Sequence, residues 1–177
     1  TFPVRYGNKA FTEEKMLLAD SNFFKFFNFT LIYGHPDTVL NGKDKLVITE
    51  SAAKRYFGYK GKGDTSPLGK TVVLAQGYPV KVSGIAADPP VNSHIHFSMI
   101  FSLSSWDVAN KGSWISNRVA TYFKLSPNTP LTSVTSKFNI LIEKYVSHEL
   151  EQLSKIDLDE FKSQGNDLQF FAQPMTD

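Results

Sequence analysis

The sequence contains no cysteine, and this absence excludes disulfide bonds, thiolate metal sites and cysteine nucleophiles. Long apolar runs are also absent, since no stretch approaches the roughly 18–20 residues that a bilayer crossing requires. An excess of one charge is missing too: 19 basic and 17 acidic side chains leave a formal net charge of +2. Such a balance provides no clustered basic face, so we expect no binding to nucleic acid.

Apolar residues make up 41% of the 177-residue chain and aromatic residues 14%, which is enough for a buried core. This length suits one domain, or two small lobes that share a core. The chain starts at Thr1 and carries no signal-peptide pattern. We therefore expect a piece excised from a longer protein.

The first third of the chain combines strands with short helices. Five phenylalanines within residues 23–29 predict a largely buried helix, with Asp20-Ser21 as its cap. Residues 30–33 and 46–48 are typical of strands. After the second strand, either Thr49 or Ser51 can cap a two-turn helix that ends at Gly58.

The middle of the chain is rich in predicted strands, and the last third begins with a helix. Residues 59–66 are expected to form a flexible polar bridge. Residues 71–75 and 78–86 are expected to pair through a turn at Gln76-Gly77, with Val80, Val82 and Ile85 facing inward. Apolar residues at helical spacing predict an amphipathic helix that starts at Thr129-Pro130. Further strands are predicted at 95–103, 119–125 and 168–172.

The search for catalytic chemistry finds no convincing arrangement. His94 and His96 could bind a metal weakly from one face of a strand, although packing of the turn at Asn92-Ser93 is favoured. The glycine-rich residues 58–66 lack the Gly-Lys-Ser/Thr ending of a phosphate loop. Ser51 has no surrounding nucleophile elbow. We therefore predict no catalytic residue, no cofactor and no metal site, and a protein that is not an enzyme.

Several segments, taken together and in order, resemble the periplasmic core domain of MacB/FtsX-like ABC transporter permeases, in particular the Bacteroides type. The resemblance covers nearly the whole chain. It rests on Ala19–Phe24, Leu31–Gly34, Val47–Gly58, Pro67–Lys70, Val82–Ile85, Asp88–His94 and Gln173–Asp177. The family domain normally begins with an additional α/β portion that this chain lacks.

The resemblance implies an α+β fold. Residues 1–66 and 126–177 would form a mixed α/β porter-like lobe, and residues 67–125 an inserted β-rich, sabre-like lobe. It also implies a non-catalytic extracytoplasmic (periplasmic) domain of an inner-membrane protein, which couples cytoplasmic ATP hydrolysis to export or to lipoprotein or peptide handling. The implied partners are a cytoplasmic ABC ATPase, a periplasmic adaptor or lipoprotein, the membrane through flanking helices, and a second copy in a dimer.

Two alternatives stay open at this point. The chain could be a stand-alone periplasmic binding protein for a peptide or lipid, with the phenylalanine-rich segment as its apolar pocket. Trp106 and Trp114 could form a partner contact, because tryptophan often anchors interfaces, or they could cap the β-rich lobe.

Overall fold

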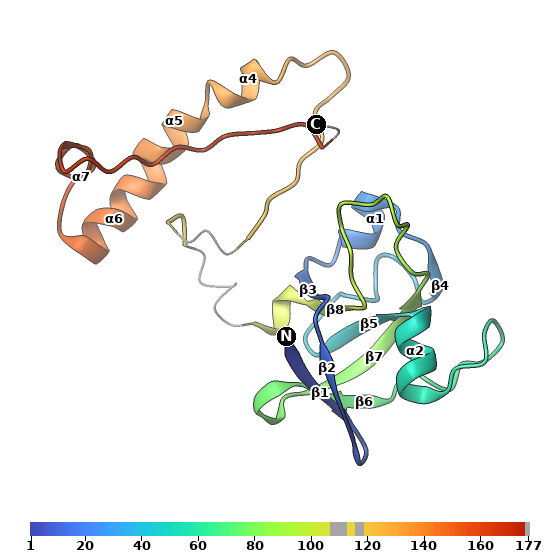
Figure 1. The fold of residues 1–177 in the computed structure, drawn as a ribbon. Coiled ribbons are helices and arrows are strands. Elements are labelled where there is room, and N and C mark those ends of the chain that lie inside the picture. The colour runs from blue at the N-terminus through green and yellow to red at the C-terminus, as the bar shows by residue number, and fades with distance from the viewer. Residues whose placement is uncertain (107–112, 116–118, 176–177) are drawn as a thin grey trace. The chain divides into compact units, whose positions relative to one another are not determined.

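The computed structural model describes residues 1–106, 113–115 and 119–175 (Figure 1). The chain forms two compact units, Thr1–Lys111 and Gly112–Asp177. In the described part of the chain, every strand and the helices α1 and α2 belong to the first unit, whereas the helices of the second unit are α4 to α7 with η3 between them. The predicted α+β fold class is confirmed.

The first unit is built on one mixed sheet in the order β2-β1-β6-β7-β5-β8-β3, with β4 paired to β7. Most neighbours are antiparallel, but β5 runs parallel to β7, and β3 runs parallel to β8. The strands are β1 (Phe2–Tyr6), β2 (Lys9–Glu13), β3 (Met16–Ala19), β4 (Leu31–Tyr33), β5 (Lys45–Thr49), β6 (Thr71–Val73), β7 (Pro79–Ala86) and β8 (Met99–Ser102).

The two terminal strands of this sheet, β2 and β3, are joined by Glu14 and Lys15 alone. One short stretch of chain therefore supplies both ends of the strand order. The sheet must curl to bring its two ends together, as Figure 1 shows. This curl places Glu13 and Lys15 beside Ser98, whose N–H donates to the Lys15 carbonyl at 2.7 Å.

Each face of the sheet has its own core. Leu46 and Ile48 of β5 belong to one cluster, and Val47 between them belongs to the other, as the alternation of a strand requires. Helix α2 (Glu50–Phe57) covers the first face, and α1 (Phe23–Phe27) covers the second. Both faces of the sheet are therefore covered by buried apolar side chains.

Strand β7 bears out the predicted inner face and explains its irregular spacing. Val80, Val82 and Ile85 are all buried. The register against β5 shifts between Leu46 and Val47, so Ser83 is the extra residue of a β-bulge. The turn before this strand is also as predicted, because Gln76 and Gly77 both have positive φ, 60° and 82°.

Some predicted elements are wrong. Residues 119–125 and 168–172 form no strand, and β1 to β3 were not predicted. Helix α1 is preceded by Asn22 as its N-cap and has no side-chain cap bond, so the predicted Asp20-Ser21 cap is not formed. The 59–66 segment, predicted to be a flexible bridge, is organised by Asp64, whose carboxylate accepts the N–H groups of Lys60 and Ser66.

The predicted lobe boundaries at residues 67 and 126 differ from the division into compact units. Strands β6, β7 and β8 come from the predicted sabre-like stretch, yet they pair within the same sheet as β1 and β5. The assignment of residues 1–66 and 126–177 to a porter-like lobe, and of residues 67–125 to a sabre-like lobe, stays a prediction.

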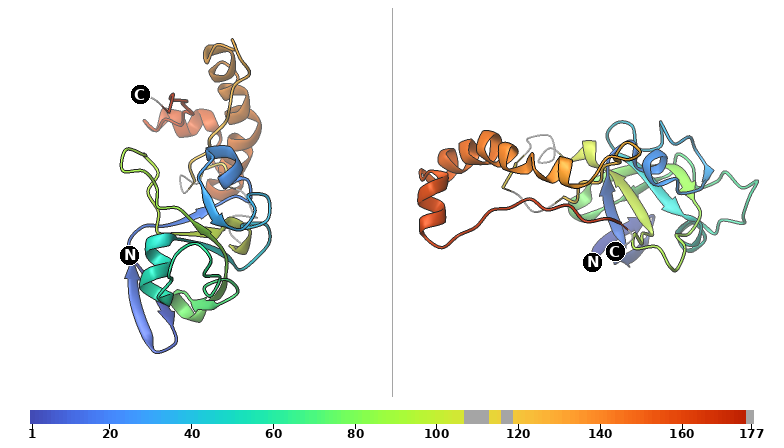
Figure 2. Two further views of the ribbon diagram at one scale, coloured as in Figure 1. Left: turned by 90° about the vertical axis from the view of Figure 1, so that its right-hand side faces the viewer. Right: turned by 90° about the horizontal axis from the view of Figure 1, so that it is seen from above.

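The second unit contains the predicted amphipathic helix as a row of consecutive helical segments (Figure 2). Ile142, Val146 and Leu150 form its buried stripe at four-residue spacing. None of the helices in the described part of the chain combines the length and apolarity that crossing a membrane requires. The segments are α4 (Thr132–Thr135), α5 (Phe138–Leu141), η3 (Ile142–Val146), α6 (Ser147–Ser154) and, after a turn, α7 (Leu158–Ser163).

Candidate interaction site

Two of the sequence landmarks meet at the amino end of α2. The Thr49 hydroxyl accepts the Ala52 N–H at 3.3 Å, so Thr49 rather than Ser51 is the cap. A second acceptor comes from 37 residues further along the chain: the Asp88 carboxylate accepts the Ser51 hydroxyl at 2.9 Å and the Ser51 N–H at 3.3 Å. Two N–H groups of the first turn, which lack partners within the helix, are satisfied in this way.

We expect the Asp88→Ala substitution to lower the free energy of unfolding by about 1 kcal/mol, the typical effect of losing a cap acceptor. Amide hydrogen exchange should accelerate in the first turn of α2, because the Ser51 N–H loses its partner. Asp37→Ala, which removes an exposed carboxylate paired with Lys25, is the matched control and should leave α2 exchange unchanged. Unchanged α2 exchange in Asp88→Ala would contradict this role.

A buried carboxylate lies next to this helix. Glu13, 3% exposed, accepts the Tyr56 hydroxyl at 2.7 Å and the Ser98 hydroxyl at 2.6 Å, and it pairs with the Arg55 guanidinium. Burial alone raises the pKa of Glu13, but the bonds from Ser98, Tyr56 and Arg55 outweigh it and lower the pKa. Burial and the Glu13 carboxylate raise the pKa of Tyr56. The cluster therefore holds Glu13 ionised.

Beside this cluster lies a hollow of about 390 Å³, which we call the α2 cleft. Its size falls within the range of ligand sites in proteins, about 300–1,000 Å³. It carries the basic side chains of Lys15, Arg55 and His96 and the single carboxylate of Asp88. The complete lining is Lys15, Thr49, Ser51, Arg55, Asp88, Pro89, Val91, His96, Phe97 and Ser98.

The loop of residues 87–98, which we call the DPP loop, forms one wall of the cleft. Prolines 89 and 90 restrict its backbone, and the Ser93 N–H donates to the Pro90 carbonyl at 3.0 Å. Phe97 is buried, whereas Val91 is 96% exposed. The loop thus holds an aliphatic side chain in solvent on a restrained backbone.

The two histidines of this loop are both exposed. The Ser93 hydroxyl accepts the Ile95 N–H at 3.1 Å, and packing of His94 and His96 at the Asn92-Ser93 turn stays a prediction. Within residues 1–106, 113–115 and 119–175, no group of three or more His, Asp or Glu side chains is arranged to hold a metal ion.

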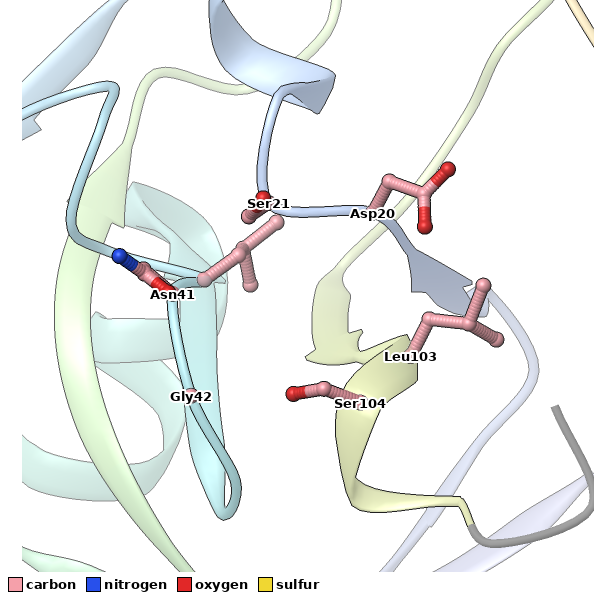
Figure 3. Close-up of a pocket in the computed structure, with 7 residues that line it drawn as sticks. Asp20, Ser21, Asn41, Gly42, Leu103 and Ser104 are labelled. Carbon is pink, nitrogen blue, oxygen red and sulfur yellow. The ribbon is translucent and has the colours of Figure 1, made fainter. Parts of the chain in front are cut away.

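A second, smaller hollow of about 200 Å³ lies between the end of β3, the 40–42 turn and η2 (Leu103–Ser105) (Figure 3). The Ser104 hydroxyl faces the Asn41–Gly42 side of this hollow, and Asp20 is its one ionisable residue. Because it is smaller and less charged than the α2 cleft, we treat the α2 cleft as the candidate site. The lining is Asp20, Ser21, Leu40, Asn41, Gly42, Leu103 and Ser104.

The two tryptophans lie in different compact units. Trp106 follows η2 in the first unit and is partly exposed. Trp114 belongs to the second unit, where its ring stacks on Tyr145 with centroids 4.7 Å apart and its N–H donates to Glu149. A partner contact through Trp106 and Trp114 stays a prediction.

The phenylalanine-rich segment packs into the core of the first unit and does not form a pocket. Phe23 and Phe24 are buried, and both contact the Phe97 ring, with centroids 5.9 and 6.3 Å away. No ring of residues 23–29 lines either hollow. Most of the motifs that line the α2 cleft are recognisable in the sequence, but nothing in the sequence indicates that the link between β2 and β3 and the DPP loop bring Lys15 and His96 to the same hollow.

Comparison with solved structures shows that the fold is a known one. A permease-protein domain from Porphyromonas gingivalis is similar at 23% identity and a TM-score of 0.65, over 81% of this chain and 64% of that one. The periplasmic region of MacB from Actinobacillus actinomycetemcomitans is similar at 22% identity and a TM-score of 0.50, over 94% of this chain and 72% of that one. This chain thus spans less than two thirds of the Porphyromonas domain. No curated protein matches it.

Residues 1–139 match the family described as MacB-like periplasmic core domain. The match includes the motif segments between Ala19 and His94 and, because it runs over residues 1–139, the whole lining of the α2 cleft. It also extends over well over half of the 177 residues. The chain therefore belongs to the MacB-like periplasmic core domains, the extracytoplasmic domains of MacB-like ABC transporter permeases.

Proposed function

We propose that this domain transmits motion in an inner-membrane ABC transporter permease, coupling ATP hydrolysis in the cytoplasm to export or to lipoprotein or peptide handling outside it. The observation that carries the proposal is the family match over residues 1–139. The curled sheet supports this proposal, because a buried apolar core on each of its faces suits the first unit to move as a rigid body.

The carboxylates at the α2 cleft support a role without catalysis. A carboxylate that acts as a general base must be free to accept a proton. Glu13 already accepts from three side chains, and Asp88 is held by Ser51. The acidic groups of this region thus serve the fold.

The partners in this proposal follow from membership of a permease family. A cytoplasmic ATPase would act through the membrane part of the permease, a periplasmic adaptor or lipoprotein would contact the outer surface, and a second copy would complete a dimer. The stand-alone binding protein is less well supported, because the phenylalanine rings on which it rests pack against one another.

The test is to replace residues 1–177 by a short Gly-Ser linker in the complete permease, reconstituted with its ATPase in vesicles. ATP hydrolysis should continue, whereas export and its stimulation of hydrolysis should be lost. Export that persists without the domain would contradict the proposal. A gene without apolar spans of about 20 residues on either side of this segment would contradict it as well.

A further inference from the structure

We propose that the α2 cleft and the DPP loop together bind an extended peptide segment of a partner protein that carries a carboxylate side chain between aliphatic ones. The inference deepens the proposed function, since it rests on the domain having a partner outside the membrane.

The basic side chains of the cleft are the first argument. Lys15 and His96 are exposed, and among the described residues the structure assigns neither the Lys15 ammonium nor the His96 ring an ion pair. Arg55 pairs with Glu13 beneath it, but its side chain is 45% exposed, and a guanidinium has five N–H donors.

The carboxylates of Asp88 and Glu13 keep their charge and leave the region close to neutral overall, but neither forms an ion pair with Lys15 in the described part of the chain. Asp88 is the one carboxylate of the lining, and its Oδ2 atom already accepts from Ser51. Glu13 lies outside the lining and is matched by Arg55. The Lys15 ammonium is therefore left to attract a carboxylate from outside.

The aliphatic wall is the second argument. Val91 is almost fully exposed, on a backbone restrained by two prolines and the Ser93 turn. A partner that covers Val91 gains apolar burial without first having to order this loop, which is the advantage of a preorganised site. Pro89 and Phe97 extend the same wall.

The two arguments together favour a peptide over a small anion. A free acetate or phosphate would form ion pairs with the basic side chains but would leave Val91 exposed to water. A cleft of about 390 Å³ holds a few residues, so one acidic residue with an aliphatic neighbour on each side fits both the charges and the wall.

The test uses the 177-residue chain and the acetylated, amidated peptide Gly-Ser-Val-Asp-Val-Ser-Gly, followed by amide chemical shifts in NMR titration. Shifts should concentrate in residues 87–98 and at Lys15 and Ser51. The same peptide with Asn in place of Asp should bind about two- to fivefold more weakly, as expected for a solvent-exposed ion pair. Lys15→Gln should abolish this preference for Asp.

Val91→Ser should weaken both peptides by about tenfold, because the aliphatic contact is lost. Lys9→Gln and Val119→Ser change exposed residues that do not line the cleft, and they should bind like the unaltered chain. Heteronuclear spectra of each variant establish that it is folded.

Four results would overturn the inference: no shifts at millimolar peptide, shifts outside the cleft, equal binding of the Asp and Asn peptides, or acetate alone reproducing the shifts and affinity. Any of these results, together with loss of export when the domain is replaced, would contradict peptide binding at this site but not the proposed function. Export that persists without the domain would contradict the proposed function instead.

Discussion

Replacing Glu13 by alanine is expected to lower the free energy of unfolding by about 2–3 kcal/mol, as is typical when one partner of a buried polar cluster is removed. The buried Tyr56 hydroxyl loses its acceptor, the Ser98 hydroxyl keeps only the Lys15 carbonyl at 3.2 Å, and Arg55 loses its counter-charge. The figure stays near the lower end of the range because Arg55 is 45% exposed and can turn to water.

Urea unfolding followed by circular dichroism measures this change. Glu14→Ala, at the exposed neighbouring position, is the control and should change stability by less than about 0.5 kcal/mol. Should Glu13→Ala fail to fold, Glu13→Gln supplies a milder variant, because it retains the shape and loses only the charge. Equal stability of the Glu13 and Glu14 variants would contradict the role of the cluster.

The same cluster predicts how stability depends on pH. Folding lowers the pKa of Glu13 below its ordinary value of 4.5, so its contribution is complete above that value and is lost as the pH falls through the folded-state pKa. The unaltered chain should lose stability below about pH 4.5 more steeply than Glu13→Gln. Parallel profiles for the two proteins would show that Glu13 does not contribute.

The second large effect is expected from Phe24→Ala, which should lower the free energy of unfolding by about 3–5 kcal/mol, the usual range for a fully buried phenylalanine. Phe24 is 1% exposed, and its ring contacts those of Phe23 and Phe97 with centroids 5.4 and 6.3 Å away. The helix and the base of the DPP loop share this cluster, so neither can easily collapse into the cavity.

Phe2→Ala provides the matched control, because Phe2 is a partly exposed phenylalanine at the start of β1. Its expected loss is below about 1 kcal/mol, since surface positions contribute little. If Phe24→Ala and Phe2→Ala unfold at the same urea concentration, the ring cluster does not stabilise the fold as described.

Most features that are determined by residues close together in the sequence were predicted correctly, whereas most features that depend on distant segments were not. The cap at Thr49 or Ser51, the short helix and its stop at Gly58 lie within ten consecutive residues; the structure confirms the helix and the stop, and it places the cap at Thr49. The Gln76-Gly77 turn is equally local. In contrast, residues 119–125 have the composition of a strand but no partner strand, and composition alone cannot supply one.

The same difference between local and long-range features holds for the candidate site. The sequence identified Ser51, Asp88 and the loop prolines as members of ordered motifs, and the family to which these motifs belong is confirmed. It gave no sign that Asp88 accepts from Ser51, or that Glu13 is buried between Arg55 and Ser98. Glu13 and Glu14 are indistinguishable as adjacent letters, yet one is buried and the other exposed.

The sequence by itself therefore determined the local units, because caps, turns and apolar periodicity act between near neighbours. Its ordered motifs identified the family by resemblance, and that resemblance implied the α+β class. The tertiary structure alone decided the curl of the sheet, the burial of Glu13 and the convergence of Lys15, Arg55 and His96 on one cleft. These features arise from pairings between residues up to 85 positions apart, such as Glu13 with Ser98. The physical reason is that strand register and side-chain burial depend on which distant segments meet, and no local pattern contains that information.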